Sequence, residues 1–166
     1  MSTGKRHRIA APPHASEVYG SVSDSQTLAA VEDSLGYHLE PTDTMESQWL
    51  SATRKIPLRD IADADLARLL ERGVHIPLLL PMALTRLRAN AQSGKPPEED
   101  LITASARAVQ LLRVGREKYA RETAAVLGTL HRACWPDLSP PQRVAFTFLV
   151  CSALERLASC GQAQKP

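Results

Sequence analysis

Residues 58–87, LRDIADADLARLLERGVHIPLLLPMALTRL, decide the fold predicted for this chain. Leucines at helical spacing predict an amphipathic helix that begins near residue 64. Asp63 precedes this helix as a candidate N-cap, and Gly73 follows it, where a left-handed residue ends many helices. The segment therefore begins with a short helix and a glycine stop. The leucines predicted to face inward are Leu66, Leu69 and Leu70.

A second helix follows in the same segment. Pro77 suits its first turn, because the N–H that proline lacks has no intrahelical acceptor there. Pro81 lies four residues later and removes one hydrogen bond from a helix that has already begun. We expect a helix that starts near Pro77 with a distorted first turn. Its predicted inward residues are Leu79, Leu80, Ala83, Leu84 and Leu87.

The rest of the chain predicts more helices and no strand. Aromatic residues are only 4% of the 166 residues, and the apolar residues are chiefly Leu, Ala, Val and Ile. We expect an all-α, single-domain, compact bundle of about six to seven helices with short loops. Residues 1–23 are expected to form a flexible basic arm, and 24–160 the helical domain. The other predicted helices are 25–35, 44–54, 98–113, 116–134 and 140–158.

Three details of these helices can be checked. In the first of them, Glu32 and Asp33 are expected on the polar face. Residues 90–97 are expected to form a loop. In the last helix, two apolar faces are expected to contact the core, which makes it largely buried. The first face holds Val144, Phe148, Cys151 and Leu154, and the second holds Ala145, Leu149 and Leu157.

Three cysteines, an odd number with no close pair, predict neither a disulfide framework nor a zinc site. Cys134 and Cys151 have apolar neighbours in the sequence and are expected to be small core residues. No run of apolar residues is long enough for a membrane helix, and no secretory signal follows the N-terminal basic residues. We expect a cytoplasmic protein without metal or cofactor.

Charge is segregated along the chain although the net charge is only +2. Residues 24–71 hold ten acidic against four basic residues, whereas 72–166 hold seven acidic against thirteen basic residues. Asp60, Asp63 and Asp65 are spaced as in a divalent-cation loop but lack its glycine and distal glutamate. Glu98, Glu99 and Asp100 suit the positive end of a helix dipole. We interpret the acids as an exposed docking surface for a basic partner.

The sequence contains no catalytic motif. Nucleotide-binding glycine loops, zinc-binding pairs of histidines and nucleophile elbows are all lacking. A competing interpretation is a helical regulator that binds nucleic acid. It would use the KRHR sequence at residues 5–8 and a basic stripe, although a solvated outer face explains that stripe more simply. The stripe comprises Arg107, Arg113, Arg116, Lys118 and Arg121.

The order of signals resembles bacterial contact-dependent growth inhibition immunity proteins. The resemblance covers about residues 27–102 and rests on RKIPLRDI at 54–61, DLARLL at 65–70 and GVHIPLLLPMAL at 73–84. The segment EDLI at 99–102 stands in place of the family's Gly-Asp-Leu-Leu-like segment, without its glycine. The matching positions are Arg54, Pro57, Asp65, Leu66, Gly73, Pro77, Leu79, Pro81, Ala83 and Leu84.

This resemblance implies a non-enzymatic inhibitor that binds a cognate toxin C-terminal domain, as a 1:1 heterodimer, and covers its active site or substrate groove. Many toxins of such systems are nucleases, with tRNA as one candidate substrate, so they carry basic grooves. An acidic surface is the expected complement, and no direct contact with nucleic acid or membrane is expected. The candidate partner-binding residues are Asp60, Asp63, Asp65, Glu71, Glu98, Glu99 and Asp100.

Overall fold

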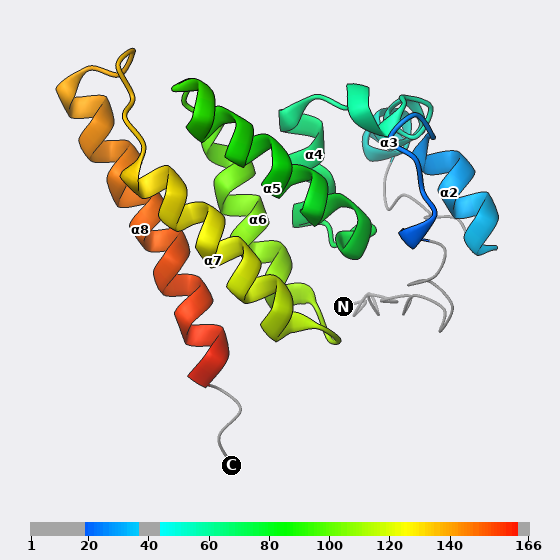
Figure 1. The fold of residues 1–166 in the computed structure, drawn as a ribbon. Coiled ribbons are helices and arrows are strands. Elements are labelled where there is room, and N and C mark those ends of the chain that lie inside the picture. The colour runs from blue at the N-terminus through cyan, green and yellow to red at the C-terminus, as the bar shows by residue number, and fades with distance from the viewer. Residues whose placement is uncertain (1–18, 37–43, 163–166) are drawn as a thin grey trace, which may run out of the picture. The chain divides into compact units, whose positions relative to one another are not determined.

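A computed structural model describes residues 19–36 and 44–162, which Figure 1 draws as a ribbon. The all-α prediction is confirmed. Over the described ranges the chain forms seven α-helices and one 3-10 helix, without a strand. Contacts divide the chain into two compact units, one up to Ile61 and one from Ala62 onward. Most of the predicted N-terminal arm, including the KRHR sequence, lies outside the described residues.

The first unit contains α2 (Leu28–Leu35), α3 (Thr44–Thr53) and the 3-10 helix η1 (Leu58–Asp60). The sequence predicted the first helix from Ser25, but it begins three residues later. Thr27 caps it, because the Thr27 hydroxyl accepts a hydrogen bond from the Ala30 N–H at 3.2 Å. Gly36 ends it in the left-handed conformation, as predicted.

Two backbone segments of the first unit pair in opposite directions. The N–H of Leu58 donates to the carbonyl of Gln26 at 2.8 Å, and the N–H of Ala29 donates to that of Arg54 at 3.1 Å. Between them, Thr27 and Pro57 form an antiparallel bridge. The lead-in to α2 is thus fixed to the segment that follows α3.

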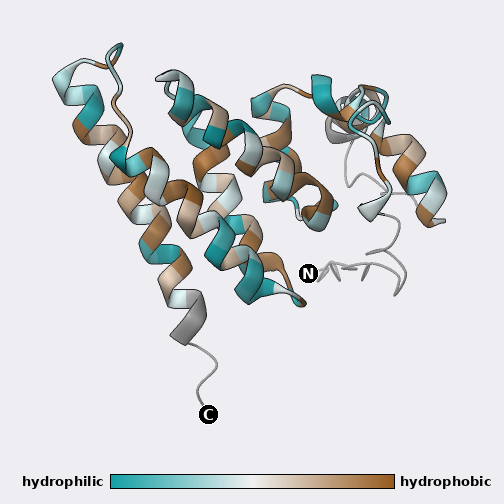
Figure 2. Ribbon diagram, in the orientation of Figure 1, coloured by the Kyte–Doolittle hydropathy of each residue, from teal (hydrophilic) through white to brown (hydrophobic). Residues whose placement is uncertain are grey.

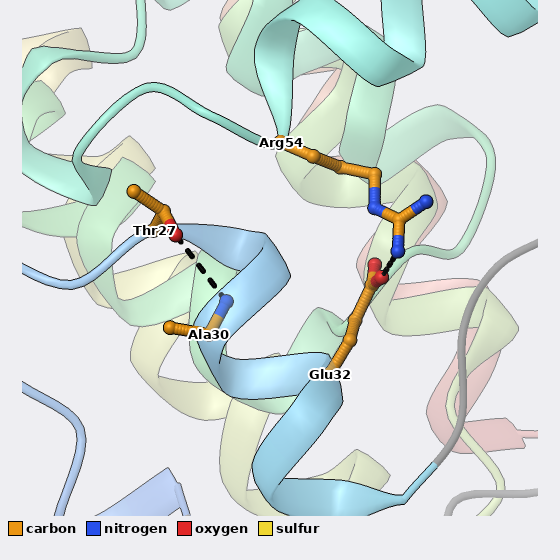
Figure 3. A network of polar contacts seen from close by, with 4 residues as sticks. All are labelled: Thr27, Ala30, Glu32 and Arg54. Carbon is orange, nitrogen blue, oxygen red and sulfur yellow. Dashed lines mark hydrogen bonds and ion pairs between the residues drawn. The ribbon is translucent and has the colours of Figure 1, made fainter.

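A buried ion pair reinforces this pairing. Arg54 donates through its Nη2 atom to the carboxylate of Glu32, whose side chain is 0% exposed (Figure 3). The prediction that Glu32 lies on a polar outer face was wrong, because Arg54 supplies a charged partner inside. Asp33, the next residue, is exposed as predicted. Removing one partner of such a pair leaves a buried charge uncompensated, which is costly.

The second unit is a two-layer stack of five helices whose directions alternate along the chain (Figure 1). One layer holds α4 (Asp63–Glu71), α6 (Glu99–Leu111) and α8 (Pro140–Gln162), with α6 packed between the other two. The other layer holds α5 (Ile76–Ser93) and α7 (Arg116–Arg132), which pack on each other and on α6. The centre of this unit is therefore α6.

The segment 58–87 forms the two helices predicted for it. At the end of α4, the N–H of Gly73 donates to the Leu70 carbonyl and that of Val74 to the Leu69 carbonyl, both at 3.0 Å. This pair of bonds is a Schellman motif, and Gly73 has the positive φ of 76° that the motif requires. All eight leucines and alanines predicted to face inward in α4 and α5 are buried.

The second helix, α5, includes Pro81 within its length. His75, with φ 40° and ψ 42°, precedes the first turn in the left-handed conformation. Pro81 cannot donate to the carbonyl of Pro77, the acceptor four residues earlier. The hydroxyl of Tyr119 in α7 approaches that carbonyl at 3.4 Å and partly replaces the lost bond. Burial is the main cause of a raised pKa at Tyr119, and the negative charge of Glu122 adds to it. The raised pKa keeps this hydroxyl protonated, so it remains a donor.

Three predictions about the second unit were wrong. The loop expected at 90–97 is shorter, because α5 continues to Ser93 and ends at Gly94, whose φ is 71°. Cys134 is exposed because α7 already ends at Arg132, and Cys151 is only half-buried. The last helix buries neither of its predicted faces as a whole. Its buried residues are Phe146, Val150, Ala153 and Leu157.

Candidate functional site

Two helix starts with acidic residues lie at the same end of the second unit. Helices α4 and α6 pack side by side and run in the same direction (Figure 1). Their far ends also meet: a Cβ placed on Gly73, just beyond α4, would lie 3.6 Å from Cδ1 of Leu111, the last residue of α6. The first turn of α4 is therefore beside the first turn of α6, although 35 positions separate Asp63 from Glu98.

Most of the predicted acids in this region are accessible to a partner. Glu98 is the N-cap residue of α6, and Glu99 and Asp100 form its first turn. All three are exposed, whereas Asp65, in the first turn of α4, is half-buried. We name Asp65, Glu98, Glu99 and Asp100 the acidic end. The positive end of the α6 dipole supports the carboxylates of Glu99 and Asp100.

Asp63 has a different role from the predicted one. Ala62 is the N-cap residue of α4 and makes no side-chain capping bond, so the capping prediction was wrong. The Asp63 carboxylate instead accepts a hydrogen bond at 2.7 Å from Nη1 of Arg86 in α5. Both side chains are about one-quarter exposed, at 26% and 23%. This ion pair joins α4 to α5 and offsets one negative charge next to the acidic end.

A groove between α4 and α6 extends from the acidic end. Its volume is about 530 Å³, and Glu71 and Asp100 both line it, together with Ala64 and Ala67. The structure therefore brings two of the predicted acids into one concave surface. Three basic residues that the sequence analysis did not assign to this site also line it: Arg68, Arg72 and Arg107.

These arginines change the charge expected for the site. Arg68 and Arg72 follow Ala64 at successive four-residue steps, so helical spacing could have placed them on one face of α4. Arg107 could not be assigned without knowing that α6 packs against α4. Arginine is enriched in protein interfaces, where its fixed fork of donors recognises carboxylates. The site combines an acidic end with a groove of mixed charge, which suits a protein surface of mixed charge.

Asp60 is the candidate residue that lies in the other unit. It ends η1 and is exposed, with a carboxylate oxygen 3.6 Å from Nε of Arg59. Exposed pairs of this kind contribute little to stability. Asp60 is therefore not one of the residues of the acidic end.

The basic residues of the stripe expected at 107–121 make different kinds of contact. Arg107 lines the groove with the acids. Arg116 donates to the carbonyls of Leu112 and Gln110 at 2.9 and 3.0 Å, which satisfies the end of α6. Lys118 and Arg121 lie 4.0 and 3.9 Å from carboxylates of α7 itself, those of Glu122 and Glu117. Three of the five basic residues of this stripe, Arg107, Lys118 and Arg121, therefore lie near acidic residues.

The described residues contain no group of three or more His, Cys, Asp or Glu side chains that could hold a metal ion. Within those same ranges, none of the helices combines the length and the apolar content needed to cross a membrane. No family model matches the chain, and neither a curated protein nor a solved structure matches it.

Proposed function

We propose that this chain is a cytoplasmic immunity protein, which binds the toxin domain of a contact-dependent growth inhibition system and blocks it without catalysis. The resemblance described above suggests the class. The observation that carries the proposal is the juxtaposition of two helix starts, in α4 and α6, that form the acidic end. A nuclease domain needs a basic surface to hold phosphates, and exposed carboxylates on rigid helices complement such a surface.

The mechanism follows from this arrangement. Glu98, Glu99 and Asp100 stand at the start of a helix that packs against α4, α5, α7 and α8, so the fold holds their backbone rigidly. Rigid charges lose little freedom on binding and accelerate the encounter with a basic partner. The adjoining groove, with Arg68, Arg72 and Arg107, would then accept acidic or amide groups that surround the basic surface. Substrate is excluded because the inhibitor occupies the same positive surface.

The test uses the toxin domain encoded by the reading frame next to this gene. Growth of cells that produce that domain should be restored by co-production of this chain, and the two proteins should purify together in equal amounts. A gene without a neighbouring exoprotein frame, or a toxin that still arrests growth when this chain is abundant, would reject the proposal. Salt-dependent binding to bulk DNA by this chain alone would favour a nucleic-acid regulator instead.

A further inference from the structure

The final described helix, α8, ends the two-layer stack with apolar residues that no described residue of the second unit covers. Its inner side packs on α6 and α7 through Phe146, Val150, Ala153 and Leu157. The Phe146 ring meets Trp135 edge-on, with ring centroids 5.1 Å apart. On the other side of the helix, Val144 and Phe148 are 72% and 74% exposed. Figure 2 shows apolar residues along most of the length of α8.

This second side forms one continuous surface. Val144 and Phe148 are four residues apart and Cys151 is three further on, so all three lie along one side of the helix. They form a shallow apolar surface with Arg143 and Thr147. The terminal helix of a stacked helical architecture ordinarily needs a polar outer side for solubility. We name Val144, Phe148 and Cys151 the α8 patch; its exposure indicates a binding surface.

The charges that flank the α8 patch indicate its occupant. Arg143 lies at one end of the patch and Glu155 at the other, and both are exposed. They are twelve positions apart, roughly 18 Å along a helix. A second copy of α8 can lie antiparallel to the first about a two-fold axis near Leu149. Arg143 of each copy then lies opposite Glu155 of the other copy. The patch is therefore complementary to itself in charge as well as in apolar character.

We propose that two copies of this chain associate through antiparallel contact of their α8 helices, with Phe148 buried near the two-fold axis. Such isologous pairing is the commonest form of protein self-association, because one surface serves both partners. Burying a phenylalanine and a valine from each copy supplies the apolar part of the free energy of dimerisation. Two Arg143–Glu155 ion pairs favour the antiparallel orientation of the helices. The inference is independent of the proposed toxin. If both hold, the complex contains two copies of each protein and keeps the one-to-one ratio.

Light scattering coupled to size exclusion tests this directly on the full chain. We expect a mass of twice 18.1 kDa that falls toward 18.1 kDa on dilution. Phe148→Asp should raise the dissociation constant of the dimer by roughly a hundredfold. Val114→Asp is the matched control, because Val114 is an 85% exposed apolar residue outside α8 and should leave the mass unchanged. Circular dichroism verifies that both variants remain helical.

A charge exchange tests the direction of pairing. Arg143→Glu and Glu155→Arg should each weaken the dimer by about tenfold, because like charges then face each other. The double variant, Arg143→Glu with Glu155→Arg, should restore it. A chain that stays at 18.1 kDa at every concentration would overturn the inference, as would a dimer that survives Phe148→Asp. Failure of the double variant to recover would overturn the antiparallel arrangement.

Discussion

Helices α6 and α8 belong to the same layer and run in the same direction, but only α6 is enclosed. Neighbours on both sides and in the second layer cover α6, which buries seven of its thirteen residues. Three of these are alanines and one is Ser105, so adjacent helices approach closely. In contrast, α8 has neighbours on one side and buries a single stripe. Where this helix ends the stack, its second apolar side stays exposed, and the proposed second copy of the chain would cover it.

The comparison also separates two kinds of binding surface. At the start of α6, a helix with neighbours on both sides presents charges, so the proposed partner would meet a rigid surface that was never apolar. On α8, the packing itself is incomplete, and a partner would complete it. The charged surface at the start of α6 is suited to a fast encounter guided by charge. The apolar α8 patch is suited to a contact that excludes water.

The largest effect is expected for a buried leucine near the start of α6. Leu101→Ala should lower the free energy of unfolding by about 3 kcal/mol, because Leu101 is 0% exposed and its truncation leaves a cavity in the core. Urea denaturation followed by circular dichroism measures this change. A loss below about 1 kcal/mol would show that α6 is not the packing centre.

The two sides of α8 can be compared with one substitution at two positions. Val150→Ala should lower the free energy of unfolding by about 2 kcal/mol, because Val150 is 0% exposed. Val144→Ala removes the same atoms from the 72% exposed side and should change it by less than about 0.5 kcal/mol in dilute protein, where the chain is monomeric. Equal losses at the two positions would mean that α8 packs on both sides.

Gly73 tests the joint between the ends of α4 and α6. Gly73→Ala should cost about 1 kcal/mol, because an alanine at φ 76° is strained although its Cβ finds ordinary contact with Leu111. Gly128→Ala is the control with the opposite sign. Gly128 lies within α7, where alanine is the better helix former, and should stabilise the chain by about 0.5 kcal/mol. Thermal unfolding of both variants distinguishes backbone strain from crowding.

The smallest effect concerns the charges at the start of α6. Replacing Glu99 by Gln and Asp100 by Asn should lower the free energy of unfolding by about 0.5 kcal/mol at low ionic strength, because both carboxylates interact with the helix dipole. The loss should shrink in high salt. In dilute protein, where the chain is monomeric, Glu155→Gln, an exposed position well inside α8, should show no comparable change. A loss that persists in high salt would contradict a dipole effect.

Much of this fold could be predicted from leucine spacing, prolines and glycines. The Gly73 stop, the helix start near Pro77 and the inward residues of α4 and α5 depend on local chemistry and on regular helical spacing. The periodicity of α8 could not show which of its apolar sides would be covered, because that depends on where the stack ends. The burial of Glu32 was not predicted for a similar reason, because its partner, Arg54, is distant in the sequence.

The candidate site was predictable only in part. Acidic residues and the first turn of α6 are visible in the sequence, because helix starts have a recognisable chemistry. The acids of α4 and α6 form one acidic end only because the two helices lie side by side and run in the same direction. The groove arginines depend on the same packing, and the engagement of Asp63 by Arg86 depends on how α5 folds back on α4.

The most direct test of the proposed function compares association rates with the toxin domain at low and physiological salt. Glu98, Glu99 and Asp100 are changed together to lysine, and the control changes Glu117, Glu122 and Asp137 to lysine, which gives the same net charge. Circular dichroism first establishes that both variants fold. We predict association slowed at least tenfold for the α6 variant, most strongly at low salt, and little change for the control. Equal rates for the two variants would contradict docking at the acidic end.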